Sequence, residues 1–300
     1  MTTGMHNDEV ATDVPLVRRL LATQFPAWTG LAVQSVASSG TDNAMYRLGA
    51  DMVVRLPRVP AAATQVDKEQ RWLPRLAPHL PLSIPTPVGR GAPAEGYPWC
   101  WSVYRWLDGH DATVARITDT RLAARTLAGF VTALRRLDPT NGPACGAGNF
   151  FRGAPLTTRE EPTREAITAL NGMRDTSSVT KVWETALNTP PWHGPSVWIH
   201  GDLAPGNLLV RRGRLGAVVD FGALGVGDPA CDLMVAWNLF SAEARNVFRG
   251  SLAVDDATWL RGRAWALSVA LIQVPYYQNT NPVLAARARR TIDEVLSDHP

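Results

Sequence analysis

Residues 200–207, His-Gly-Asp-Leu-Ala-Pro-Gly-Asn, and residues 218–222, Val-Val-Asp-Phe-Gly, decide how this chain folds. In phosphoryl-transfer sites with this pattern, an Asp in the catalytic loop orients the acceptor hydroxyl and a later Asn binds Mg²⁺. The Asp of a following Asp-Phe-Gly triplet holds the metal at the phosphates. The order and spacing therefore indicate a kinase-like active site, with Asp202 as the catalytic base and Asn207 and Asp220 as ligands of Mg²⁺.

The residues between the two motifs predict a β-hairpin. Residues 207–210 and 216–219 are largely apolar and flank the polar, glycine-containing stretch 211–214, which is typical of two strands and a turn. Such a hairpin has Asn207 at its beginning and Asp220 at its end. We therefore expect these two side chains to lie close enough to bind one metal site.

The first hundred residues predict a small antiparallel sheet with accompanying helices. Apolar or β-branched stretches separated by polar turns indicate strands, which we expect at residues 31–37, 45–48, 52–56 and 99–104. Apolar residues at helical spacing predict helices at 15–25 and 62–76, the second of which carries Glu69. A turn at Asp108 and Gly109 then separates this part from the rest.

Downstream the periodicity becomes helical. We expect helices at residues 112–137, 161–170, 180–187, 260–274 and 282–296, the fourth of them stopped by Pro275. The expected fold class is α+β and bilobal, with a small sheet-containing lobe and a larger, mainly helical lobe. We assign nucleotide binding to a lobe of residues 1–104, and catalysis and acceptor binding to a lobe of residues 105–300.

Residues 200–207, 220–222 and 225–233 resemble the aminoglycoside phosphotransferase family, whose members are relatives of protein kinases. The similarity extends over nearly the whole chain. It implies a protein-kinase-like fold, a nucleotide cleft at the hinge between two lobes, and ATP or GTP with Mg²⁺ as cofactors. It also implies that Asp232 anchors the catalytic loop through hydrogen bonds, a structural role.

In that family a lysine on the third strand grips the nucleotide phosphates and pairs with a glutamate on the next helix. The matching residues here are Arg55 and Glu69, since Lys68 sits in the helix. An arginine keeps the charge, but its planar head is larger than an ammonium group, so the phosphate geometry must differ. The alternative is an exposed strand arginine without a role.

Two further stretches are expected to contact the nucleotide. The turn of Ser38, Ser39, Gly40 and Thr41 offers hydroxyl and N–H groups to phosphate oxygens, although it has one glycine where the protein-kinase pattern has three. A simple hairpin turn would look the same. The inferred hinge, Val103, Tyr104, Arg105 and Trp106, is the candidate for purine stacking, while aromatic packing in the core is the alternative.

Composition argues against several classes of protein. The net charge of +3 comes without a basic run, so we expect no nucleic acid partner. The three cysteines are widely spaced, which disfavours a disulfide framework or a Cys-x-x-Cys metal site. No apolar stretch approaches the roughly 20 residues of a membrane span, and the polar beginning of the chain resembles no signal peptide. We expect a cytoplasmic protein with no membrane partner, and its oligomeric state stays open.

These observations predict a nucleoside-triphosphate-dependent O-phosphotransferase acting on a small hydroxylated molecule, with an aminoglycoside or related antibiotic as the first candidate. The acidic residues that a polycation needs are interspersed with arginines and form no patch. A kinase for another metabolite, such as a sugar, amino alcohol or nucleoside, is therefore an alternative. A silent nucleotide- or drug-binding protein is a second, but binding alone does not need the base Asp202.

Overall fold

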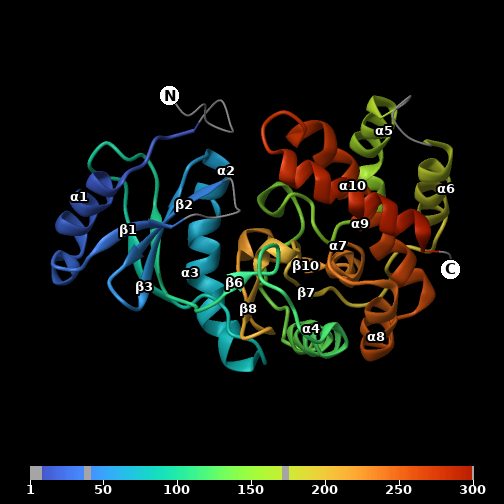
Figure 1. Cartoon of the computed structure of the whole chain (residues 1–300), viewed down its shortest axis with the longest axis horizontal. Helices are drawn as coiled ribbons and strands as arrows, with labels where there is room; N and C mark the ends of the chain where they lie inside the picture. Colours follow the sequence, from blue (N-terminus) through green and yellow to red (C-terminus); the bar gives the residue numbers. More distant parts are fainter. Residues whose placement is uncertain (1–8, 37–41, 171–175, 299–300) are drawn as a thin grey trace.

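The chain folds into two lobes that lie side by side along its longest axis (Figure 1). The computed structural model describes residues 9–36, 42–170 and 176–298. The N-terminal lobe is built on an antiparallel sheet, and the C-terminal lobe is mostly helical. The α+β, bilobal prediction is therefore confirmed.

The sheet of the N-terminal lobe has the order β1-β2-β3-β5-β4 and is antiparallel throughout. Its strands are β1 (Val33–Val36), β2 (Asn43–Leu48), β3 (Met52–Pro57), β4 (Pro87–Gly91) and β5 (Trp101–Arg105). The predicted antiparallel sheet is confirmed, but β4 was not anticipated. Its Pro87, Gly89 and Gly91 disfavour a strand, and it forms at the sheet edge, where proline is tolerated, with a register shift between Pro87 and Gly89.

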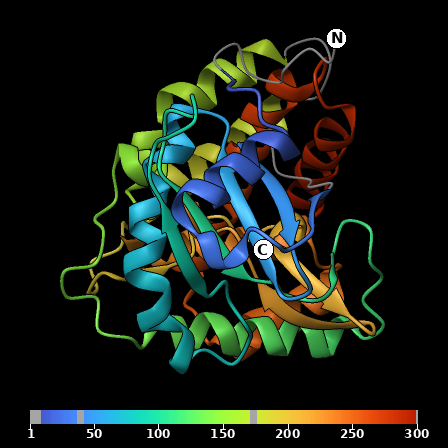
Figure 2. The same cartoon turned by 90° about the vertical axis from the view of Figure 1, so that its left-hand side faces the viewer.

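Helices cover both faces of this sheet. They are α1 (Val14–Gln24), α2 (Pro60–Ala63) and α3 (Gln65–Leu76). Val54 packs in one apolar cluster with Leu20 of α1, whereas its neighbour Val53 packs in another with Leu73 of α3. Because successive strand residues point to opposite faces, α1 and α3 lie on opposite sides of the sheet. The N-terminal lobe faces the viewer in Figure 2, with α1 in front of the strands.

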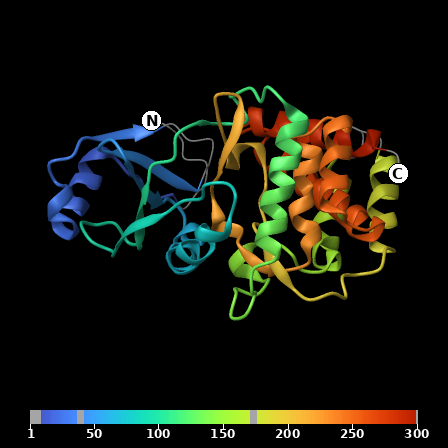
Figure 3. The same ribbon diagram turned by 90° about the horizontal axis from the view of Figure 1, so that it is seen from below.

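The C-terminal lobe is organised around one long buried helix, α9 (Asp256–Tyr277), which packs against α5, α6 and α10. The other helices are α4 (Thr120–Arg135), α5 (Glu160–Ala169), α6 (Thr176–Leu187), α7 (Val235–Asn238), α8 (Ala242–Leu252) and α10 (Pro282–Ser297). Seen from below, α4 runs beside α8 (Figure 3). No helix in the described ranges is long and apolar enough to cross a membrane.

Several helix boundaries differ from the prediction, and two of these differences have a clear physical cause. α4 begins only at Thr120 because the Asp119 carboxylate caps it, accepting the Leu122 N–H at 2.8 Å. α9 continues through Pro275 to Tyr277. The predicted stop was wrong because proline removes a single N–H here, in the last turn of a helix that is already packed on several sides.

The predicted hairpin is confirmed and leads directly to the motif residues. It consists of β8 (Leu208–Arg211) and β9 (Arg214–Val218), which pair antiparallel. The short strand β6 (His110–Asp111) pairs with β8, and β7 (Val197–Ile199), which precedes His200, pairs with β10 (Gly225–Gly227). These pairings bring both motifs to the side of the C-terminal lobe that contacts α3.

Candidate active site

Asp232 holds the beginning of the catalytic loop. Its buried carboxylate accepts the His200 N–H at 2.9 Å through Oδ2 and the Gly201 N–H at 2.8 Å through Oδ1. Gly201 has a φ of 82°, and a Cβ there would lie 2.4 Å from the Ala223 carbonyl oxygen. Only glycine therefore fits this turn, which leads from β7 to Asp202.

His200 packs beneath the loop. Its ring is fully buried and lies edge-on to Phe221, with 4.6 Å between ring centres. Nδ1 accepts the Asp202 N–H at 3.2 Å, which assigns the proton to Nε2, and Nε2 donates to the Val219 carbonyl at 3.1 Å. Both ring nitrogens are thus used in holding backbone, so His200 is a positioning residue.

The side chains of Asp202 and Asn207 are brought together by hydrogen bonds. Asn207 Nδ2 donates to the Asp202 carbonyl at 2.8 Å and to its carboxylate Oδ2 at 3.0 Å. The Asp202 side chain is 38% exposed, so its carboxylate is accessible to a ligand. Because Asn207 uses its nitrogen here, its Oδ1 is left as an oxygen donor for a metal.

Asp220 lies beside these residues. The Val219 N–H donates to the Asn207 carbonyl at 2.9 Å, which joins the two ends of the hairpin. Asp220 adopts a φ of 63° and is 42% exposed. A carboxylate and an amide oxygen at adjacent positions suit a hard cation that keeps waters or phosphate oxygens as its other ligands, so the residues present fit Mg²⁺.

Arg55 and Glu69 lie across from Asp220 in the N-terminal lobe. Arg55 Nη1 is 2.7 Å from both carboxylate oxygens of Glu69, and its Nη2 is 2.7 Å from Asp220 Oδ1. With its amide oxygen turned toward Arg55, Asn43 accepts from Nη2 at 2.9 Å. Burial acts to lower the Arg55 pKa, but the charges of Glu69 and Asp220 outweigh it and raise this pKa well above its usual value.

The predicted hinge residues lie mostly inside the fold. Val103 is buried in the sheet core, and the Tyr104 hydroxyl donates to Glu69. Arg105 donates its N–H to the Thr86 carbonyl at 2.9 Å. The guanidinium carbon of Arg47 lies over the Trp106 ring, 3.8 Å from the ring centre. The predicted phosphate turn of Ser38, Ser39, Gly40 and Thr41 lies outside the described residues.

Sequence reasoning places two charged residues outside this site: Lys68 is set aside as a helix residue, and Arg152 is not considered. Lys68 Nζ donates to the carbonyl oxygens of Gly222 at 2.5 Å and Gly148 at 3.0 Å. Burial lowers the pKa of Lys68 to about 8. Arg152 Nη2 lies 3.6 Å from Asp202 Oδ1. Two sequence signals point to Lys68: the lysine that the family resemblance calls for, and its rarity, because only one other lysine occurs in the chain. Arg152 sits in a loop without a pattern.

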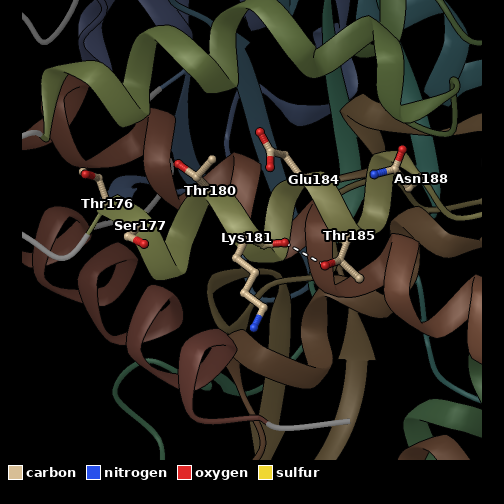
Figure 4. Close-up of a pocket in the computed structure, with 7 residues that line it drawn as sticks. All are labelled: Thr176, Ser177, Thr180, Lys181, Glu184, Thr185 and Asn188. Carbon is tan, nitrogen blue, oxygen red and sulfur yellow. Dashed lines mark hydrogen bonds between the residues drawn. The ribbon is translucent and has the colours of Figure 1, made fainter.

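A groove also lies on α6 and the residue that follows it, at the outer side of the C-terminal lobe (Figures 1 and 4). It is lined by Thr176, Ser177, Thr180, Lys181, Glu184, Thr185 and Asn188. These side chains come from one helical face, and Glu184 is 3.7 Å from Arg164. None of them belongs to the group around Asp202 and Asp220, so the groove is a polar helix surface.

The comparisons with known proteins agree with this arrangement. The model of the phosphotransferase enzyme family (APH) matches residues 33–265. A search of curated proteins gave no match. Among solved structures, the GDP and kanamycin complex of APH(2")-IIia has a TM-score of 0.74 at 19% identity, covering 93% of this chain and 97% of that one.

Two further solved structures are similar. The GDP complex of wild-type aminoglycoside 2'-phosphotransferase-IIIa has a TM-score of 0.71 at 18% identity, covering 95% of this chain and 99% of that one. The apoenzyme of macrolide 2'-phosphotransferase MphH from Brachybacterium faecium has a TM-score of 0.62 at 23% identity, covering 96% and 99%. At these identities the likeness establishes a common fold.

Proposed function

The chain belongs to the APH phosphotransferase enzyme family, and from this premise we propose that it transfers the γ-phosphoryl group of ATP or GTP to a hydroxyl of a small molecule. The observation that carries the proposal is the meeting of Asp202, Asn207 and Asp220 at the two ends of one hairpin. The proposal includes two lobes with separate roles: residues 1–104 bind the nucleotide, and residues 105–300 carry catalysis and acceptor binding.

Each residue of the site has a separate task. Asp202 orients the acceptor hydroxyl toward the γ-phosphorus and accepts its proton as the new oxygen–phosphorus bond forms and the nucleoside diphosphate leaves. Asn207 Oδ1 and Asp220 would hold Mg²⁺, which neutralises charge on the phosphate oxygens when bound. Arg55, positioned by Glu69, supplies the positive charge on the opposite side of the phosphates.

The relatives support a choice of nucleotide and of acceptors to assay. Some solved structures with this fold are complexes with GDP or with ATP, which supports a purine nucleoside triphosphate as donor. Another similar structure is a complex with the aminoglycoside gentamicin, and a further one is a macrolide phosphotransferase. Hydroxylated antibiotics are therefore the first acceptors to assay, together with hydroxylated metabolites.

The decisive variant is Asp202→Asn, which keeps the shape of the side chain and removes the base. We expect kcat to fall by about 10² to 10⁴ while the Kd of the nucleotide stays unchanged, because Asp202 acts on the acceptor. Phosphate addition is followed by mass spectrometry on a panel of antibiotics and metabolites. Asp256→Asn is the control, since that side chain is 91% exposed. Undiminished turnover by Asp202→Asn would contradict the proposal.

A further inference from the structure

Two arginines share one tryptophan beside the catalytic loop. The guanidinium carbons of Arg152 and Arg159 each lie 5.6 Å from the centre of the Trp265 ring, a distance at which cations are attracted to an aromatic face. Arg159 Nε also donates to Ser268 Oγ at 3.2 Å. Since Arg152 Nη2 lies 3.6 Å from Asp202 Oδ1, two positive charges gather next to the proposed base.

The charges at this place do not balance. Among the residues that the structure describes, Asp202 is the sole carboxylate within 4.0 Å of Arg152, and Arg159 has none. The buried Asp228 is already paired with Arg261 at 2.8 Å. Burial and the charge of Arg152 lower the pKa of Arg159 to about 10. A partly buried positive charge without a counter-charge is costly, and an anionic ligand would remove this cost for Arg159.

The loop that carries Arg152 is held in an unusual conformation. Phe150 and Phe151 both have a φ of 56°, which large side chains rarely adopt. Asn149 keeps the loop in place, because its Nδ2 donates to the Arg152 carbonyl at 2.9 Å. Backbone strain maintained by such contacts is concentrated at ligand-binding sites. Here it fixes the position from which Arg152 reaches Asp202.

Building on the phosphotransfer proposed above, we infer that the acceptor carries an anionic group, a carboxylate or a phosphate, which Arg152 and Arg159 bind next to Asp202. A guanidinium matches either anion, because it can donate two parallel hydrogen bonds to it. An anion bound by Arg152 also draws that guanidinium from Asp202, which frees the carboxylate to accept the hydroxyl proton. The same two charges repel a polycation, so the site selects against an aminoglycoside.

Isothermal titration calorimetry tests this on the protein saturated with Mg²⁺ and a non-hydrolysable ATP analogue, so that no titrated anion can take the place of the γ-phosphate. The titrants are inorganic phosphate, gluconate and kanamycin. We expect phosphate and gluconate to bind saturably, and Arg159→Met to weaken both by roughly tenfold. Arg164→Met is the matched control, because Arg164 is exposed and lies 3.2 Å from Glu160.

Three results would overturn the inference: no saturable binding of either anion, equal anion affinity in Arg159→Met and wild type, or tighter binding of kanamycin than of both anions. If Arg159→Met does not fold, Arg152→Met serves in its place and should show the same loss. Failure of the ATP analogue to bind would contradict the phosphotransfer proposal instead. Titrating wild type and Arg159→Met without the analogue then still decides whether the arginines form an anion site, because an anion at the γ-phosphate position would bind both proteins equally.

Discussion

Arg55 Nη2 lies 2.7 Å from Asp220 Oδ1, so the cation expected at the phosphates is joined directly to the carboxylate expected at the metal. Arg55 is held in this position from behind by Glu69, which contacts its other terminal nitrogen at 2.7 Å. A metal that binds Asp220 must therefore share this carboxylate with Arg55 or displace it. The ion pair links the two lobes directly.

Replacing Arg55 by lysine tests this competition. A single ammonium cannot contact Glu69 and Asp220 in the way a planar guanidinium does, so Arg55→Lys should release Asp220. We expect the Mg²⁺ concentration that gives half-maximal activity to fall by roughly fivefold, the factor that corresponds to losing about 1 kcal/mol of competing ion pair. Arg121→Lys, in an exposed pair with Glu243, is the control. An unchanged or higher Mg²⁺ requirement in Arg55→Lys would argue against competition.

Asp232→Ala should uncouple the catalytic loop from its support. The change leaves the buried N–H groups of His200 and Gly201 without an acceptor, at a cost of about 1 to 3 kcal/mol for each. We expect urea denaturation to report a lower free energy of unfolding, and kinetics to report a lower kcat with little change in the nucleotide KM. A kcat equal to that of wild type would show that Asp202 does not depend on this anchor.

The residues around Asp202 could be predicted because their arrangement is local: a strand, a turn and a hairpin place Asp202, Asn207 and Asp220 on consecutive segments. Lys68 and Arg152 could not. Their contacts join segments that are far apart in the chain, as in the hydrogen bond from Lys68 to the Gly222 carbonyl. No local pattern encodes such a contact.

The same reason explains the missed strand β4. Its proline and glycines carry little strand preference, and its pairing with β5 supplies the structure. The expected end of α9 at Pro275 is an opposite case. Proline is a local signal for a helix end, but packing against other helices outweighs it and α9 continues. Sequence patterns therefore predict the helices and strands whose own residues favour them. Contacts with distant segments decide the other elements, such as β4, and some helix ends, such as that of α9.

Lys68 should give the protein a characteristic pH dependence. Burial lowers its pKa from 10.5 to about 8, so between these values the folded chain has released a proton that the unfolded chain still holds. The free energy of unfolding must then rise with pH in this window, by at most about 3 kcal/mol at 1.36 kcal/mol per pKa unit. Subtracting the profile of Lys68→Met, measured by urea denaturation from pH 7 to 10.5, isolates this rise. A difference that is flat with pH would contradict it.

Two glycine substitutions should change stability in opposite directions. In Gly201→Ala the new Cβ would lie 2.4 Å from the Ala223 carbonyl oxygen, at a φ of 82°, so the turn before Asp202 must shift. We expect a loss of at least about 1 kcal/mol of unfolding free energy together with a lower kcat.

Gly129 lies inside α4, and a Cβ there meets nothing within 4 Å. Gly129→Ala should therefore stabilise the protein by roughly 0.5 to 1 kcal/mol, because alanine is the better helix former, and should leave kcat unchanged. Thermal and urea unfolding of both variants measure the contrast. Equal effects of the two substitutions would show that the close approach at Gly201 is not a constraint on the catalytic loop.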